Sequence, residues 1–236
     1  MTKIRTVFFD AGFTLVDLAS PVLDVYLGAA RDVGAEIDAS AFGQSFNRCW
    51  MRLEEDYRKR CPELTSSEEI ERGAWRSFTS GIAEEFPALL DRHADWHGRL
   101  VQHFDDPSAW RPVPDALTTL ERLSASGLRM AVVSNWHSAL IPILESHGLR
   151  KHFSFVLTSA EAKRKKPHRD IFEQALSRLG STAEETAHVG DSWNDDVEGA
   201  LGAGLRAIHI HRGSGQPRSD PMVTVIRRLR EIDLGQ

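Results

Sequence analysis

Hydrophobic positions follow two different periods along this chain. Residues 4–9 form a short run rich in β-branched and aromatic side chains, which predicts a buried strand that ends at Asp10. Between about residues 16 and 104 the apolar residues recur at helical spacing, for example at positions 22, 25, 26 and 29. This stretch contains no convincing strand. The pattern therefore predicts several helices directly after the first strand.

Beyond residue 107, strand-like and helix-like segments alternate. We expect strands over residues 129–133, 153–158, 186–189 and 205–210. We expect helices over residues 114–126, 137–147, 168–179, 195–203 and 223–232. Several of these helices are followed by a glycine, which is a common helix end.

Strands that alternate with helices indicate βαβ units and a mostly parallel sheet with helices on both faces. The predicted fold class is therefore α/β, with a Rossmann-like, doubly wound sheet. The helical stretch lies between the first strand and the others, so we expect it to be an inserted, all-helical cap. The predicted domains are a core of residues 1–16 and 108–236 and a cap of residues 17–107.

Composition and charge exclude several classes of protein. The 236 residues suffice for one large domain, or a core with an insertion, at about 150 residues per domain. An apolar fraction of 41% and a charged fraction of 27% are ordinary for a globular protein and argue against disorder. The formal charge of −5 argues against a nucleic-acid partner. No apolar run approaches the roughly 18 residues of a membrane span, so no membrane partner is expected.

The ends and cysteines of the chain predict a cytoplasmic protein. The apolar stretch before Asp10 is too short for the core of a signal peptide. The two cysteines, Cys49 and Cys61, have no metal-ligand spacing, and we expect reduced thiols.

Polar residues follow the predicted strands at the places where chemistry is expected. In an open parallel sheet, ligands bind beyond the carboxyl ends of the strands. Four segments of this chain place carboxylates, a hydroxyl and a lysine at that edge, and four such signals in order are stronger than any one. The candidate residues are Asp10, Thr14, Ser134, Asn135, Lys166, Asp191 and Asp196.

This set of side chains is suited to phosphoryl transfer. Asp10 could attack phosphorus as a nucleophile and form an acyl phosphate. Asp10, Asp191 and Asp196 could together hold Mg²⁺, which prefers oxygen ligands. Lys166 and the Ser134 hydroxyl could neutralise and orient phosphate oxygens. The expected partner is thus a small phosphorylated molecule.

Nearby polar residues have simpler explanations. A carboxylate at a strand end is often only a helix cap or turn residue, an alternative that stays open for Asp10 taken alone. For Asp195 we favour a position in the first turn of a helix. The basic run of residues 163–165 is interpreted as a solvated turn. His137 is interpreted as a surface residue at a helix N-terminus.

Four segments resemble the motifs of the haloacid dehalogenase-like hydrolase superfamily. The segments, in chain order, are VFFDAGFTL, AVVSN, KKPHRDIF and HVGDSWNDDVEGALGAGL. They span essentially the whole chain, and the helical stretch has the position of the superfamily's helical cap. The resemblance implies a nucleophile and metal ligand at Asp10, and a backbone carbonyl ligand at Gly12. It implies that Thr14 steers the nucleophile loop.

The resemblance also gives roles to the later motifs. Ser134 and the backbone near Asn135 would bind phosphate, and Lys166 would bridge phosphate and nucleophile. Asp191 would bind Mg²⁺, with Asp196 in support, directly or through water.

One position departs from the family pattern. Phosphatases of the family carry a second aspartate two residues after the nucleophile, as general acid and base, and here that residue is Gly12. General acid–base help is typically worth about 10²–10⁴-fold. The chain is therefore expected to be slow, to handle good leaving groups, or to use an acid from the cap. Asp17 is a candidate for that acid.

Other functions remain open on the same scaffold. Haloacid dehalogenases also lack the second aspartate, but they do not usually keep an aspartate at the position of Asp191. Phosphonate-cleaving relatives use a cap lysine, and the one cap lysine is Lys59, in a charged run that favours a solvated helix face. A catalytically impaired binding or regulatory protein is a further alternative. The substrate and the oligomeric state are not fixed by the sequence.

Overall fold

A six-stranded parallel sheet forms the centre of the protein. The computed structural model describes residues 2–60, 63–218 and 220–235. Within these ranges it does not describe the side chains of residues 54 and 56–60. The strand order is β5-β4-β1-β6-β7-β8, and each neighbouring pair is parallel. The strands are β1 (Thr6–Phe9), β4 (Arg129–Ser134), β5 (Val156–Thr158), β6 (Thr186–Gly190), β7 (Arg206–Ile210) and β8 (Val223–Ile226). This architecture confirms the predicted α/β class.

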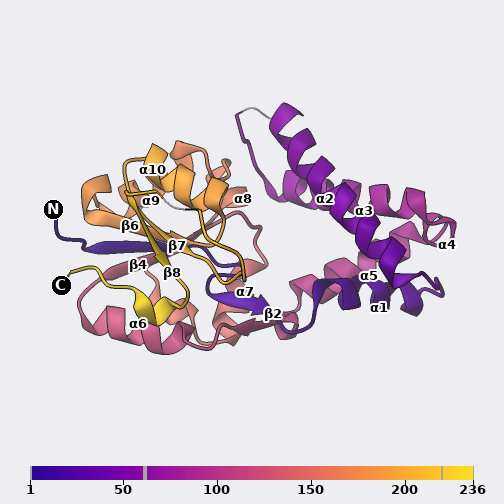
Figure 1. Cartoon of the computed structure of the whole chain (residues 1–236), viewed down its shortest axis with the longest axis horizontal. Coiled ribbons are helices and arrows are strands. Elements are labelled where there is room, and N and C mark those ends of the chain that lie inside the picture. The colour runs from indigo at the N-terminus through magenta and orange to yellow at the C-terminus, as the bar shows by residue number, and fades with distance from the viewer. Residues whose placement is uncertain (1, 61–62, 219, 236) are drawn as a thin grey trace.

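Helices cover both faces of the sheet (Figure 1). One face packs against α6 (Ala116–Ala125) and α7 (Leu140–Ser146), and the other against α9 (Arg169–Leu179) and α10 (Gly199–Gly202). Successive strand residues alternate between these layers, as a period of two requires. Phe9 and Val132 belong to the α6–α7 layer, whereas Phe8 and Val133 belong to the α9–α10 layer. Each such fully buried side chain stabilises the fold by about 1.5–3 kcal/mol.

A separate helical lobe lies beyond the carboxyl ends of the strands (Figure 1). It consists of α1 (Val22–Asp32), α2 (Ala39–Arg60), α3 (Glu68–Glu85), α4 (Pro87–Leu90) and α5 (His93–Asp105). Its own apolar core includes Phe42, Ile82 and Trp96, all fully buried. The Trp96 indole also donates a hydrogen bond to the carbonyl of Tyr26, 3.1 Å away, which ties α5 to α1.

Two short strands connect the lobe to the sheet. β2 (Val16–Leu18) and β3 (Trp110–Pro112) pair antiparallel, and Figure 1 shows β2 between the two parts of the molecule. The expectation of no convincing strand between about residues 16 and 104 was therefore wrong at β2. A strand of three residues is too short to establish a period of two, so its pattern gave no signal. The predicted boundary at residues 16/17 falls within β2 and that at 107/108 lies just before β3, and both stay predictions.

The predicted helices near the C-terminus needed two corrections. Residues 223–232 form β8 and a 3₁₀ turn at Leu229–Glu231, not a helix. Apolar residues spaced three apart suggested the helix, but the β-branched residues 223–226 pair with β7 at the sheet edge instead. The helix expected at 195–203 begins earlier, as a π-helix over Trp193–Glu198 that runs into α10.

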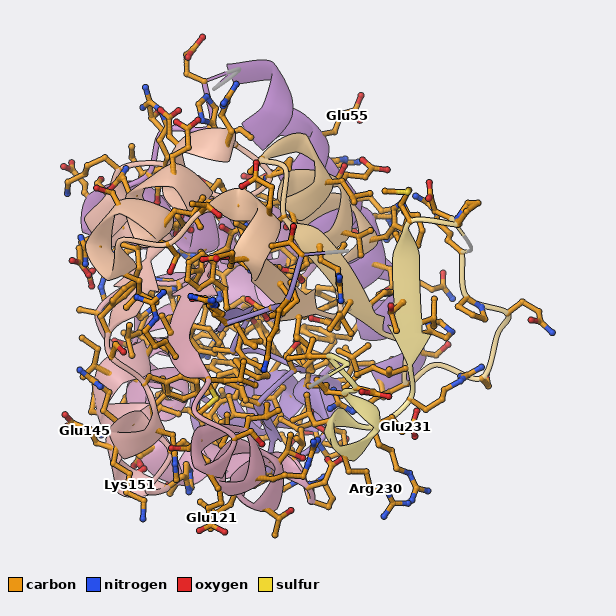
Figure 2. The ribbon with its side chains drawn as sticks, turned by 90° about the vertical axis from the view of Figure 1, so that its left-hand side faces the viewer. Glu55, Glu121, Glu145, Lys151, Arg230 and Glu231 are labelled. Atoms are coloured by element: carbon orange, nitrogen blue, oxygen red, sulfur yellow. The ribbon has the colours of Figure 1, made fainter. Side chains whose placement is uncertain are left out.

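Charged side chains cover the outer surface. Figure 2 shows Glu121, Glu145, Lys151 and Arg230 pointing away from the body of the protein, and all four are exposed. Among the described residues, no helix has the length and apolarity that crossing a membrane requires.

Candidate active site

Asp10 stands at the centre of the sheet edge. It directly follows β1, and the chain places β4 on one side of β1 and β6 on the other. This is the topological switch point of the sheet, where the neighbouring strands diverge and leave room for a ligand. The backbone N–H of Asp10 donates to the carbonyl of Val189, 2.9 Å away, and its side chain is largely buried.

A buried lysine joins two of the predicted aspartates. Lys166 Nζ lies 2.7 Å from Oδ1 of Asp10 and 2.6 Å from Oδ1 of Asp196. The Ser134 hydroxyl donates to the same Oδ1 of Asp10, at 2.9 Å. Among the described residues, no donor reaches Oδ2 of Asp10. One oxygen of this carboxylate is therefore held in place while the other stays open.

The charges in this cluster shift one another's pKa values. Burial alone lowers the pKa of Lys166, but the two carboxylates outweigh it and raise that pKa above its usual value. Burial raises the pKa of Asp10, and Lys166 opposes this shift. For Asp196, Lys166 and His188 outweigh burial and hold the pKa well below its usual range. Lys166 therefore stays charged, and Asp196 stays ionised beside it.

Asp10, Asp191 and Asp196 form a cluster that fits a cation. One oxygen from each lies within 4.8 Å of the others. Burial, followed by repulsion from Asp10 and Asp196, raises the pKa of Asp191 to about 7. Crowded, partly desolvated carboxylates of this kind are relieved by a hard cation, and oxygen donors are those that Mg²⁺ prefers. Thr14 is buried, and its hydroxyl donates to Asp191 Oδ1 at 3.4 Å, so it steadies Asp191 rather than Asp10.

Asn135 holds the backbone of Lys166. Its Oδ1 accepts from the Lys166 N–H at 2.7 Å, and its Nδ2 donates to the Lys166 carbonyl at 3.0 Å. Nδ2 also lies 3.3 Å from the Asp195 carboxylate. Asp195 occupies the first turn of the π-helix, as expected, and burial raises its pKa. The structure thus brings all eight predicted site residues to one sheet edge.

The basic run of residues 163–165 is only partly the solvated turn that was expected. Lys163 is exposed, but Lys165 lines the cavity described below, and its Nζ lies 3.9 Å from Oε2 of Glu71. His137 likewise is not a free surface residue. Its two ring nitrogens each lie 3.7 Å from a carboxylate of the helical lobe, on Glu68 and Asp105.

The space beside Gly12 is filled by an indole ring. A Cβ added at Gly12 would lie 3.1 Å from Cζ3 of Trp136. The proposed substitute acid, Asp17, lies in β2, accepts a hydrogen bond from the Leu18 N–H at 2.9 Å, and is not among the residues lining the cavity. The candidate Lys59 lies outside the described side chains.

Sequence reasoning missed two residues that shape the site. His188, in β6, is buried and its Nε2 lies 2.8 Å from Oδ1 of Asp196. A Cβ added at Gly190 would lie 2.1 Å from Cγ of Asp196, so only glycine lets this carboxylate approach the strand. The signal was present: alternation along β6 puts His188 and Gly190 on one face, opposite Ala187 and Val189.

A cavity of about 700 Å³ opens from the site toward the helical lobe. Asp10, Lys166 and Asp191 lie at its inner end, and aromatic side chains from the lobe form much of its wall. The cavity thus places the Asp10 carboxylate, the buried Lys166 ammonium and further aspartates beside a largely aromatic wall. This arrangement can attack an electrophile whose remainder is apolar enough to lie against the lobe.

Comparison with known proteins agrees with this geometry. The family model of the haloacid dehalogenase-like hydrolases matches residues 4–204. Haloacid dehalogenase-like hydrolase domain-containing protein 3 of Bos taurus is 31% identical over 227 residues, 94% of this chain and 86% of that protein. Glyceraldehyde 3-phosphate phosphatase of Methanothermobacter thermautotrophicus is 35% identical over 163 residues, 64% of this chain and 68% of that protein.

Solved structures share the fold. The crystal structure of a dehalogenase superposes with a TM-score of 0.71, over 98% of this chain and 96% of that one. The two sequences are 22% identical, so this likeness concerns the fold alone.

Proposed function

The chain belongs to the haloacid dehalogenase-like hydrolase family, and we propose that it is a phosphatase of a small phosphorylated molecule that works through Asp10. The observation that carries the proposal is the carboxylate of Asp10. Its Oδ1 is held by Ser134 and Lys166, while Oδ2 is free of donors among the described residues. Relatives named as phosphatases support this kind of hydrolase.

The proposed reaction has two balanced steps. First, Oδ2 of Asp10 attacks phosphorus, the bond from phosphorus to the leaving oxygen breaks, and the leaving group departs with the electron pair. Second, water attacks the acyl phosphate, the bond from phosphorus to Asp10 breaks, and phosphate and the free carboxylate are released. The water's proton passes to solvent. Lys166 and Ser134 stabilise the negative phosphoryl oxygens by hydrogen bonds and charge.

We propose that Mg²⁺ is the cofactor. Asp10, Asp191 and the Gly12 carbonyl would hold it, with Asp196 in support, and the raised pKa of Asp191 supports a bound cation there. When bound, Mg²⁺ would neutralise charge on the phosphoryl oxygens. The helical segment of residues 17–107 is the proposed cap, which would cover the cavity and select the substrate.

Two other functions share these residues. A dehalogenase would use the Asp10 carboxylate to displace halide from carbon, which the glycine at position 12 permits. Asp191 argues against that function, because a crowded, half-buried carboxylate has no evident role without a cation. A protein that binds phosphate without turnover would keep the same pocket.

Release of phosphate from an activated aryl phosphate tests the proposal. An aryl leaving group barely needs protonation, so the assay bypasses the missing acid at position 12. We expect turnover that requires Mg²⁺, disappears in EDTA and is abolished by Asp10→Asn. Asp91→Asn, at an exposed carboxylate that does not line the cavity, is the matched control and should keep wild-type activity.

The opposite results are equally clear. Activity retained by Asp10→Asn would refute the nucleophile. Metal-independent release of halide from 2-haloacids, without phosphate release, would favour the dehalogenase. Binding of Mg²⁺ and phosphate with no turnover of any substrate would favour the non-enzyme.

A further inference from the structure

Aromatic rings form a large part of the wall of the cavity that contains Asp10. They come from four elements of the helical lobe and its link, and from the loop after β4. The rings that matter here are Phe46, Trp50, Trp75, Phe104, Trp110 and Trp136. Resting on the proposed phosphatase function, we propose that this wall binds a planar aromatic leaving group, so that the substrate is an aryl phosphomonoester.

The aromatic wall has apolar area that the protein itself leaves uncovered. Trp50 is 49% exposed although its ring contacts Phe46, stacked at 6.5 Å, and Phe78, edge-on at 5.7 Å. Phe13, on the loop after Asp10, is 52% exposed and also lines the cavity. Covering exposed aromatic surface with a flat apolar group is favourable, because apolar area is removed from water. Offset or edge-on contacts between the rings would add to this binding free energy.

Two of the four indole N–H groups of this wall, on Trp75 and Trp110, are already engaged within the protein. The Trp75 indole N–H donates to the Tyr26 hydroxyl at 2.9 Å. The Trp110 indole N–H donates to the Phe104 carbonyl at 3.0 Å. Glu71 accepts from the Ser159 hydroxyl at 3.1 Å and also pairs with Ser66. A leaving group rich in hydroxyls would lose its hydrogen bonds to water and find only part of them replaced on this wall, which disfavours its binding.

The missing acid points independently to the same class of substrate. Position 12 is glycine, with the Trp136 indole beside it, so no carboxylic acid reaches the leaving oxygen from that position. A phenol such as that of tyrosine has a pKa near 10, roughly five units below that of water, so an aryloxide can depart unprotonated. An alkoxide cannot, and would lose the roughly 10²–10⁴-fold that an acid supplies.

Three substrates test the argument from apolar contact and the argument from the missing acid separately. Phenyl phosphate and 2-naphthyl phosphate have similarly acidic leaving groups but different apolar area, whereas glycerol 3-phosphate is small, hydroxylated and a poor leaving group. We expect kcat/KM for naphthyl phosphate to exceed that for phenyl phosphate by about 10-fold or more, since added apolar contact gives gains of that order. We expect phenyl phosphate to exceed glycerol 3-phosphate by about 10²-fold or more.

Variants on one helix locate the subsite. Trp50→Ala removes an exposed ring of the wall and should bring the naphthyl-to-phenyl ratio of kcat/KM close to one. Met51→Ala is the matched control, because Met51 is the next residue of α2, is 64% exposed and does not line the cavity. It should leave the ratio unchanged. Calorimetric titration of Asp10→Asn with 2-naphthyl phosphate and phenyl phosphate measures the same preference without turnover.

The possible outcomes distinguish a failure of the aromatic subsite from a failure of the proposed phosphatase function. Hydrolysis that depends on Asp10 but shows no naphthyl preference, or prefers glycerol 3-phosphate, overturns the aromatic subsite and leaves the phosphatase intact. Loss of the preference in both Trp50→Ala and Met51→Ala also overturns it. If no phosphate ester is hydrolysed, the phosphatase fails, and equal Kd values for the two aryl phosphates would then refute the subsite as well.

Discussion

Replacing Lys166 by methionine keeps most of the side chain's length and removes the cation between two buried carboxylates. Nζ lies 2.7 Å from Asp10 Oδ1 and 2.6 Å from Asp196 Oδ1, and the side chain is 2% exposed. With an effective dielectric constant of about 20, each contact supplies about 6 kcal/mol of attraction, much of which offsets the cost of burying the charges. Removing one partner of a buried pair typically costs about 3–5 kcal/mol. We expect Lys166→Met to lose that much free energy of unfolding at pH 8.

The loss should become smaller as the pH falls. Without the lysine, Asp10, Asp191 and Asp196 repel one another. The folded-state pKa values of Asp10 and Asp191 then rise further above their unfolded values, and the pKa of Asp196 rises from its lowered value. A carboxyl with a raised folded pKa destabilises the protein above its unfolded pKa, and this effect fades as the pH falls toward that value. Urea unfolding in EDTA at pH 8 and pH 5 measures the difference. Adding Asp196→Asn to Lys166→Met should recover part of the stability lost at pH 8.

Lys163→Met is the matched control, because Lys163 is an exposed lysine in the same turn. Its unfolding free energy should stay within about 0.5 kcal/mol of wild type. A loss below about 1 kcal/mol for Lys166→Met at pH 8, or an equal loss at both pH values, would refute the electrostatic reasoning.

Three further predictions address other parts of the molecule. Gly190→Ala should abolish activity and destabilise the protein in urea, since its Cβ would lie 2.1 Å from a site carboxylate, whereas Gly28→Ala, with open space around it, should stabilise by about 0.5–1 kcal/mol. Burial, followed by nearby arginine charge, lowers the pKa of His97 from 6.5 to about 4. The free energy of unfolding should therefore fall by up to about 3 kcal/mol as the pH drops from 6.5 to 4, and His97→Asn should reduce this pH dependence. Gly12→Asp alone should barely raise the turnover of glycerol 3-phosphate, because the Trp136 indole crowds the new side chain. The double variant Gly12→Asp, Trp136→Ala should raise this turnover by about 10²-fold, and an equal gain from Gly12→Asp alone would refute the steric argument.

The sheet was predictable from the sequence because its strands are buried on both faces. Runs such as residues 129–133 and 205–210 are mostly apolar, rich in β-branched residues and followed by polar residues, so they need no tertiary information to be recognised. β2, β3 and β8 were missed for the opposite reason. They are short and lie at an edge or outside the main sheet, where pairing with a neighbour decides the conformation and local pattern does not.

Most residues of the candidate site were predictable from the sequence, but not His188 or Gly190, and not the contacts between side chains. Strand ends place Asp10, Ser134 and Asp191 at one edge, and this follows from topology alone. That Thr14 supports Asp191, or that Trp136 fills the space beside Gly12, depends on side-chain directions in loops. The sequence indicates which residues lie at the candidate site, whereas side-chain packing determines which of their atoms are in contact.

Hydrogen bonding divides the three carboxylates of the site into two kinds. Both oxygens of Asp196 are occupied: Oδ1 accepts from Lys166 and lies 2.8 Å from Nε2 of His188, and Oδ2 accepts from the Ser192 N–H at 3.0 Å. Oδ2 of Asp10, in contrast, has no donor among the described residues. In that part of the chain, the side chain of Asp191 accepts one hydrogen bond, from the Thr14 hydroxyl at 3.4 Å. A cation would therefore take direct bonds most readily from Asp10 and Asp191. Asp196 is better suited to hold the lysine against the nucleophile, and a glycine in β6 gives it the room to do so.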